Sequence, residues 1–218
     1  VFDDTFLKSV IDNSYAFNNE SSKTFPRIVD GCQNFYFNQI EDQSKQEGKY
    51  RTLDGSRYYF PWNEDEIKIF DKVNYFWRNI RILSGHHPCS YENNIPSNRV
   101  INRIHIIQYY SGGGTISPHF DPYVHQYIQI GCVLNEYGKD FQEGGFCAFD
   151  EKDNLVFLEP EIKKGSLLCF FPSMFHTVSP IDPDKNLDIN SSEGRWFMSV
   201  VSTSSSLDKN RNTAQPKV

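Results

Sequence analysis

The sequence predicts a mainly β fold with helices near its N-terminal end. From residue 99 to residue 203, short apolar and β-branched segments alternate with turn residues about every 8–12 positions, a spacing typical of a sandwich or barrel. Before residue 99, the clearest periodic segment repeats apolar side chains every three or four residues, which indicates a helix with one apolar face. Together these observations predict helices packed against a closed or two-layered sheet.

The N-terminal region, residues 1–98, is expected to supply helices, loops and a wall of the substrate site. Residues 2–11 have the apolar spacing of a short helix, and residues 64–83 form the stronger one. Asn63 is placed to cap that second helix, with Glu66 three residues later as in a capping box. Residues 31–49 are compatible with either a helix or a strand.

The core is expected over residues 99–203, within a single domain spanning 1–218 whose polar residues 204–218 form a tail. Alternating or continuous apolar patterns predict about eight strands. They cover residues 100–110, 115–121, 126–134, 145–149, 155–158, 166–171, 175–178 and 195–203. The polar segment 182–194 interrupts the pattern before the last strand and is expected to act as an insertion.

Composition excludes several classes of function. The net charge is −6 and no run of Lys or Arg occurs, which argues against a nucleic-acid partner. No apolar run approaches the roughly 18 residues of a membrane span, and no signal peptide is visible. The five cysteines are odd in number and form no CxxC pair, so free thiols in a reducing, cytoplasmic compartment are expected. The oligomeric state is not predicted.

A candidate metal site lies in the segment Ser117-Pro118-His119-Phe120-Asp121. On an extended strand, side chains two residues apart point to the same face, so His119 and Asp121 are presented side by side. His176, from a later strand, would complete a set of two histidines and one carboxylate. That set suits non-haem Fe(II) with open coordination positions. Taken alone, His-x-Asp also fits a surface turn begun by Asp121 and the proline after it.

Five segments in order carry a family resemblance. They are Tyr110-x-x-Gly113 followed by His119-x-Asp121, Gly144-Gly145-x-x-x-Phe149, Lys164-Gly165-Ser166-Leu167-Leu168-x-Phe170, His176-x-Val178-x-Pro180, and Gly194-Arg195-Trp196-Phe197-Met198-Ser199. With these segments, residues 100–203 resemble the catalytic core of Fe(II)/2-oxoglutarate-dependent dioxygenases, in the prolyl-4-hydroxylase-like and phytanoyl-CoA-hydroxylase-like branch. The resemblance implies a double-stranded β-helix, a jelly-roll or cupin-like core.

The resemblance also implies roles for individual residues. His119, Asp121 and His176 would bind Fe(II), and Arg195 would bind the C5 carboxylate of the co-substrate 2-oxoglutarate. Arg195 could instead be a surface charge at a strand start. It follows His176 by 19 positions, more than is usual in the family, because of the polar insertion. Where the family often has a second tyrosine, three residues before the first ligand, this chain has Ile116.

Further contacts are expected on the predicted strand face and in the loop after Asp121. Tyr110 and Gln108 would contact the co-substrate, although Tyr110 could equally be a core residue. Asn102 lies an even number of residues from both and would face the same side. Tyr123 and His125 follow Asp121 closely enough to touch substrate. The alternative for His125 is an exposed loop position.

The expected function is an oxygenase that uses Fe(II), 2-oxoglutarate and O2 to hydroxylate or otherwise oxidise an unactivated C–H of a small molecule. An amino acid or a natural-product intermediate would suit, with release of succinate and CO2. A carboxylate at Asp121 argues against halide transfer. The alternatives are a peptidyl, prolyl-type hydroxylase, a non-haem iron enzyme that needs no 2-oxoglutarate, and a non-catalytic metal-binding cupin-like module.

Overall fold

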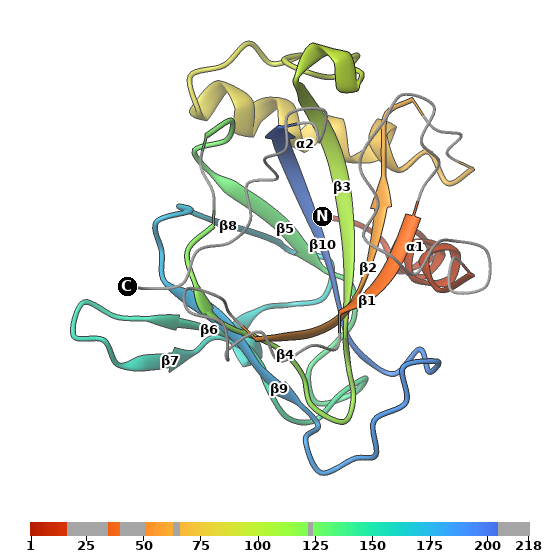
Figure 1. The fold of residues 1–218 in the computed structure, drawn as a ribbon, viewed down its shortest axis with the longest axis vertical. Coiled ribbons are helices and arrows are strands. Elements are labelled where there is room, and N and C mark those ends of the chain that lie inside the picture. Colours follow the sequence, from red (N-terminus) through yellow and green to blue (C-terminus); the bar gives the residue numbers. More distant parts are fainter. Residues whose placement is uncertain (17–34, 40–50, 63–65, 122–123, 205–218) are drawn as a thin grey trace.

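The computed structural model describes residues 1–16, 35–39, 51–62, 66–121 and 124–204. Within them the chain is mainly β, which confirms the predicted fold class (Figure 1). The helices are α1 (Asp4–Ala16) and α2 (Ile69–Leu83), with short 3-10 turns η3 (Pro96–Asn98) and η4 (Glu159–Glu161). The strands are β1 (Phe35–Gln39), β2 (Thr52–Tyr59), β3 (Val100–Tyr110), β4 (Gly114–His119), β5 (Gln129–Val133), β6 (Gly145–Phe149), β7 (Leu155–Phe157), β8 (Leu167–Phe170), β9 (His176–Ile181) and β10 (Gly194–Ser204).

The strands form one curled antiparallel sheet in the order β7-β6-β9-β4-β2-β3-β10-β5-β8, and β1 pairs with β2 at the side. Strand β2 joins two halves, because its first residues pair with β4 and its later residues pair with β3. We call β1, β2, β3, β10, β5 and β8 the major sheet, and β4, β9, β6 and β7 the minor sheet. Figure 1 shows the two halves diverging from β2, with α1 and α2 lying against the major sheet.

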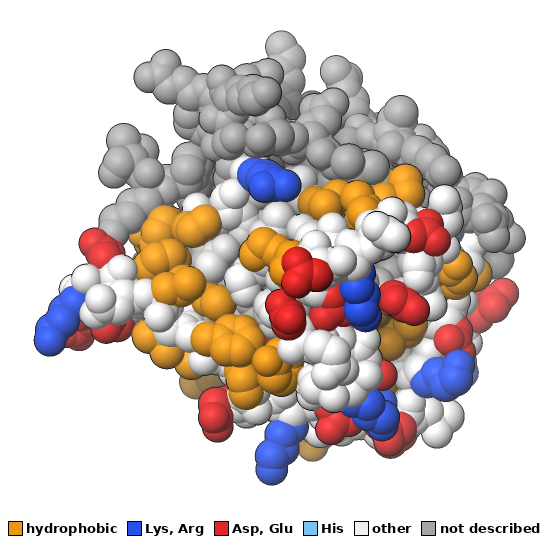
Figure 2. Space-filling view, turned by 90° about the horizontal axis from the view of Figure 1, so that it is seen from below, with side chains coloured by type: hydrophobic (Ala, Val, Ile, Leu, Met, Phe, Trp, Pro, Cys, Tyr) orange, Lys and Arg blue, Asp and Glu red, His pale blue; other side chains and the backbone are white. Residues whose placement is uncertain are grey.

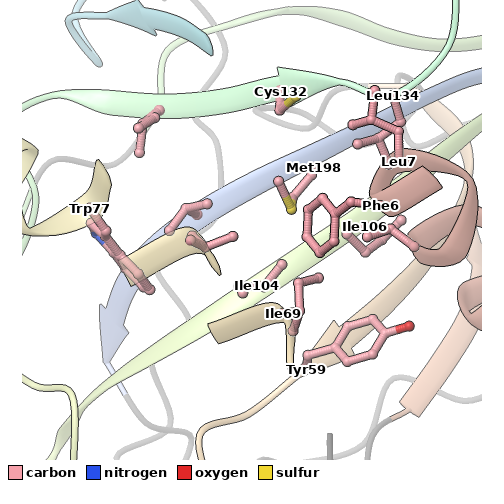
Figure 3. Close-up of a cluster of buried hydrophobic side chains, with 14 of the residues drawn as sticks. Phe6, Leu7, Tyr59, Ile69, Trp77, Ile104, Ile106, Cys132, Leu134 and Met198 are labelled. Carbon is pink, nitrogen blue, oxygen red and sulfur yellow. The ribbon is translucent and has the colours of Figure 1, made fainter. Parts of the chain in front are cut away.

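The outer face of the major sheet packs against the helices. Ile104 and Ile106 of β3 and Met198 of β10 point to this side, where Trp77 of α2 and Leu7 of α1 cover them (Figure 3). All five side chains are almost completely buried. This cluster is the main hydrophobic core. Because it occupies one face of the major sheet, the opposite face of that sheet points away from the helices.

The inner face of the major sheet packs against the minor sheet. Ile107 and Tyr109 of β3 form a second cluster with Ile116 of β4 and with Val178 and Ile181 of β9. Side chains alternate along a strand, so the odd-numbered residues of β3 face the minor sheet and the even-numbered ones face the helices.

Strand β2 was not predicted, because buried polar residues interrupt its pattern. Asp54 accepts hydrogen bonds from Thr52 and Ser56. Arg57 is fully buried and donates to the carbonyl oxygens of Ser14 and Gly55 and to Gln108. Because these polar groups have hydrogen-bond partners, burying them in a central strand does not carry the free energy cost of burying an unpaired polar group. Strand β1 lies where the sequence left helix and strand open.

Helix α2 begins later than predicted. Residues 66 and 67 form a turn, and Lys68 precedes the helix in a left-handed conformation, with φ 51°, and makes no side-chain cap. The expected cap residue, Asn63, lies outside the described residues. Helix α1 runs beyond the predicted residues 2–11 and ends at Ala16.

The glycine turn between β3 and β4 is a site of close backbone approach. Gly112 and Gly113 have positive φ values of 92° and 107°, and a Cβ on Gly114 would lie 2.2 Å from the backbone nitrogen of Tyr110. Asp182, at the start of the predicted insertion, accepts a hydrogen bond from Ser111 at 2.8 Å. The turn is therefore tied to the segment that follows β9.

On the surface seen from below Figure 1, the described residues mix acidic and basic side chains with apolar ones and form no continuous basic area (Figure 2). None of the helices in the described residues is both long enough and apolar enough to cross a bilayer.

Candidate metal centre

The structure brings His119, Asp121 and His176 together. His119 ends β4, Asp121 follows it by two residues, and His176 begins β9 in direct register with His119. The Nε2 atoms of both histidines lie 3.6 Å from an oxygen of Asp121, Oδ1 for His119 and Oδ2 for His176. One ligand atom from each residue lies within 4.8 Å of the others, and this is the one such group of three among the described residues.

A shift in the register of β4 turns His119 inward. Ile116 also faces the interior, where it packs against Val178. Residues three apart on a regular strand point to opposite faces. The pairing of β4 with β9 is irregular between Ile116 and His119, and such an irregularity re-aims the side chain that follows it. Both residues can then face the major sheet.

Backbone carbonyl groups orient the two imidazole rings. His119 Nδ1 lies 2.8 Å from the carbonyl oxygen of Ser117, and His176 Nδ1 lies 2.9 Å from that of Met174. A neutral imidazole that donates from Nδ1 has its lone pair on Nε2, the atom that points at Asp121. Each ring therefore presents a metal-binding nitrogen to the same small volume.

The local electrostatics favour the metal-binding protonation states. Burial alone would raise the pKa of Asp121, but the adjacent side chains of His119 and His176 hold it below its ordinary value. Burial lowers the pKa of His176. A carboxylate beside neutral imidazoles is the form in which these side chains coordinate a metal ion. Two nitrogens and one oxygen on one side of a site fit Fe(II) with positions left open for other ligands.

Arg195 is buried in the interior, so it is not the surface charge that the sequence left possible. It is 1% exposed and starts the inner face of β10. Its Nε donates to Glu159 Oε1 at 2.9 Å, and Glu159 Oε2 accepts the backbone N–H of Phe146 at 2.7 Å. The ring of Phe146 lies 5.7 Å from that of His176. The guanidinium is thus connected to the wall of the metal site through two residues.

One donor of Arg195 has no partner. Its Nη2 is buried, and no atom of the described residues accepts a hydrogen bond from it. A buried guanidinium nitrogen without an acceptor is costly, and the C5 carboxylate of 2-oxoglutarate would provide one. The residues therefore fit this co-substrate. Glu159 was missed in the sequence, where it lies in a polar turn that gives no sign of burial.

The structure does not bring Asn102, Gln108 and Tyr110 to the ligand cluster. They are even-numbered residues of β3 and lie on its helix-covered side. Gln108 accepts from Arg57 Nη2 at 2.9 Å, and Asn102 accepts from Ser202 Oγ at 2.8 Å. The Tyr110 hydroxyl occupies the space beside Gly55 on the same side. The prediction placed the three residues correctly on one strand face, but that face is turned away from the metal ligands.

Of the two loop residues after Asp121 that were predicted to contact substrate, the structure describes one. Tyr123 lies outside the described residues. His125 is partly buried, and its Nε2 lies 2.9 Å from the hydroxyl of Ser204, at the end of β10. Burial lowers the pKa of His125. This contact with Ser204 does not involve a metal ligand, so the role of His125 toward substrate stays a prediction.

Comparisons with known proteins agree with this geometry. A scan against protein-family models finds no match, and a search of curated proteins finds none either. Solved structures do match. A prolyl-4-hydroxylase from Pseudomonas putida has a TM-score of 0.52 and 13% sequence identity, covering 100% of this chain and 89% of its own.

Two further structures give similar results. A 2OG-Fe(II) oxygenase family protein from Caulobacter crescentus has a TM-score of 0.54 and 13% identity, covering 91% of this chain and 73% of its own. An oxygenase from Shewanella oneidensis has a TM-score of 0.51 and 11% identity, covering 91% and 77%. At these identities the similarity establishes architecture. The chain has the jelly-roll fold of the Fe(II)/2-oxoglutarate oxygenases.

Proposed function

We propose that this protein is an Fe(II)- and 2-oxoglutarate-dependent oxygenase. It would hydroxylate, or otherwise oxidise, an unactivated C–H of a small molecule such as an amino acid or a natural-product intermediate, releasing succinate and CO2. The observation that carries the proposal is the convergence of His119, Asp121 and His176, from the end of β4 and the start of β9, around one small volume. The fold shared with known oxygenases supports the same assignment.

The three ligand residues would hold Fe(II) on one side and leave the opposite positions open. The bound iron supplies the activation of O2, which side chains alone do not provide. The contribution of the chain is to fix the geometry. The carbonyl oxygens of Ser117 and Met174 hold the imidazole rings, and the backbone N–H of Asp121 donates to the carbonyl of Pro172 at 3.1 Å. The ligands are therefore positioned before any metal binds.

Arg195 would bind the C5 carboxylate of 2-oxoglutarate through its Nη donors. Its Nε is already held by Glu159, so the guanidinium is fixed in one orientation. The planar fork has five N–H donors, which is enough for both carboxylates. Glu159 also neutralises the buried cation when no co-substrate is present. This arrangement supports a role in positioning the co-substrate.

Aromatic side chains would keep water away from the reacting groups. The ring of Phe170 lies 4.9 Å from that of His176, and the ring of Phe146 lies 5.7 Å from each of these rings. Excluding water strengthens the electrostatic interactions of the site and protects reactive species from side reactions.

The test is metal-dependent binding and turnover of 2-oxoglutarate. Calorimetry with Mn(II) should show that 2-oxoglutarate binds tightly only when the metal is present. With Fe(II) and air, adding the small-molecule fraction of a cell extract should raise succinate release. His119→Ala, Asp121→Ala and His176→Ala should each abolish both effects. His87→Ala removes an exposed histidine outside the cluster and should behave as wild type.

The outcomes separate the alternatives. Metal binding without any effect of 2-oxoglutarate would contradict the proposal and favour a binding module or another iron enzyme. Succinate release stimulated only by proline-containing peptides would move the substrate to the peptidyl class, the class named for the Pseudomonas putida structure. The single-domain organisation, the cytoplasmic location and the absence of nucleic-acid and membrane partners stay predictions.

A further inference from the structure

A second arginine, Arg103, lies on the inner face of the major sheet. It belongs to β3 and has the same parity as Ile107 and Tyr109, which pack against the minor sheet. It lies toward the start of the strand, four residues before Ile107, and like His105 it is only partly buried. Arg103 therefore faces the side of the major sheet that carries the candidate metal site.

The strand register places Arg103 level with the metal ligands. One row of residues crosses the major sheet at right angles to its strands. Phe170 pairs with Gln129, and Val201 pairs with Arg103. Continuing the β10–β5 register one residue past the pair Val200 and Ile130 sets Gln129 beside Val201 and completes the row. At ~4.8 Å between neighbouring strands, the row spans about 14 Å. The ring of Phe170, at one end of the row, lies 4.9 Å from His176, and Arg103 stands at the other end, so a substrate that contacts both the metal and the guanidinium has to bridge the width that the Arg103 side chain does not itself cover.

The guanidinium is held in place by aromatic contacts. Its central carbon lies 4.6 Å from the centroid of the Tyr58 ring. That ring stacks on the imidazole of His105, with 4.3 Å between centroids, and His105 Nε2 lies 2.8 Å from the hydroxyl of Ser56. Stacking on an aromatic ring orients the planar fork without using its N–H donors.

Within the part of the chain that the structure describes, Arg103 has no counter-ion. Arg103 has no ion pair with any described residue, and its buried Nε has no hydrogen-bond acceptor among them. Burial lowers its pKa, with no carboxylate among the causes to offset it. The other arginines of this sheet differ, since Arg195 is paired with Glu159 and Arg57 donates to two carbonyl oxygens. Arg103 is partly buried, and its Nε is shielded from water without an acceptor in the described residues, which favours an anionic ligand.

We propose that Arg103 binds a carboxylate of the substrate, so that the oxidised molecule is a small carboxylic acid such as an amino acid. This inference rests on the proposed function, because it takes the metal site as the reacting end. A single guanidinium matches the one charge and the flat, two-oxygen geometry of a carboxylate. A phosphate monoester, with about two charges at neutral pH, would call for a second cation. On the described inner face of the major sheet, the other arginine is Arg195, which is paired with Glu159 and is assigned to 2-oxoglutarate.

The test uses a panel of free amino acids and small carboxylic acids, each with its primary amide, plus matched phosphate monoesters. Binding is measured by calorimetry on the full chain, with and without Mn(II) and 2-oxoglutarate. At least one carboxylate should bind and its amide should not. Arg103→Gln should weaken that binding by about ten-fold or more and leave 2-oxoglutarate binding unchanged. Arg99→Gln, which removes an exposed arginine four residues away, is the matched control and should bind as wild type.

Three results would overturn the inference: equal binding of the carboxylate by Arg103→Gln, preference for amides or phosphate monoesters, or no carboxylate-dependent binder in the panel. Failure of the proposed function has a different signature. In that case Mn(II) would not promote 2-oxoglutarate binding in wild type, Arg99→Gln or Arg103→Gln, whatever the panel shows.

A stability measurement separates binding from a structural role. Arg103→Met removes a partly buried charge that has no ion pair with a described residue, so its melting temperature without ligand should not fall below that of wild type. Arg57→Met removes a buried arginine whose donors are satisfied and should melt at a lower temperature. An equal loss in both variants would show that Arg103 is a structural residue and would contradict the proposal.

Discussion

The buried pair of Arg195 and Glu159 makes a quantitative prediction. Each side chain is 1% exposed, and Glu159 also accepts the N–H of Phe146. Replacing Arg195 with Met leaves a buried carboxylate without its cation, and breaking a buried pair in this way costs ~3–5 kcal/mol. Replacing both residues, as Arg195→Met with Glu159→Leu, removes both charges and should cost much less than the sum of the single changes.

The assay is urea unfolding of the metal-free protein, followed by circular dichroism. The coupling energy from the four proteins of the cycle should be at least ~2 kcal/mol. Asp12→Ala, which breaks the exposed pair with Lys8, is the control and should cost no more than ~0.5 kcal/mol. A cost below ~1 kcal/mol for Arg195→Met, or additive single changes, would refute the reasoning that the pair is tightly coupled.

Three further predictions concern packing and pH. Gly131→Ala should cost ~1–3 kcal/mol in urea unfolding, because its Cβ would lie 1.9 Å from the ring of Phe197; an unchanged midpoint would contradict this. Trp77→Ala should cost ~3–5 kcal/mol, since the side chain is 0% exposed, and a loss below ~1 kcal/mol would show that the core closes over the gap. Burial alone would raise the pKa of Asp182, but Lys185 and other donors hold it below its ordinary value. The resulting stabilisation is present above the ordinary pKa of ~3.9 and is lost as pH falls through the lower folded value. Asp182→Asn should therefore be less stable at pH 7 and lose less stability on acidification, and an unchanged pH profile would contradict the assignment.

The metal ligands could be predicted from the sequence because local rules constrain them. His119 and Asp121 are two residues apart on an extended segment, and His176 is the histidine that a later strand supplies. The strand boundaries in this part of the chain were also close to those observed, since apolar runs there are separated by glycine and polar turns. What the sequence did not contain was the register irregularity of β4, which turns His119 to the same side as Ile116.

The side-chain direction of β3 could not be predicted in the same way. Both faces of this strand are covered, one by the helices and one by the minor sheet. Polar residues occur on each face, with Gln108 on the outer one and His105 on the inner one. Alternation alone therefore does not say which face meets the metal site. Only the contacts of Ile104 with α2 and of Ile107 with β4 and β9 decide it.

Contacts between residues far apart in the sequence could not be predicted either. Glu159 meets Arg195 across 36 positions of sequence, and the turn that carries it resembles an exposed loop. Strand β2 enters the sheet between β3 and β4 although Asp54 and Arg57 interrupt its apolar pattern. In both cases tertiary contacts satisfy groups that the local sequence marks as solvent-exposed.

The most direct test of the central claim is a crystal structure of the protein prepared without oxygen in the presence of Fe(II) and 2-oxoglutarate. We predict one metal ion bound by His119 Nε2, His176 Nε2 and an oxygen of Asp121, with the C5 carboxylate of 2-oxoglutarate on the Nη atoms of Arg195. A metal bound elsewhere, or a co-substrate that does not contact Arg195, would contradict the assignment of this site.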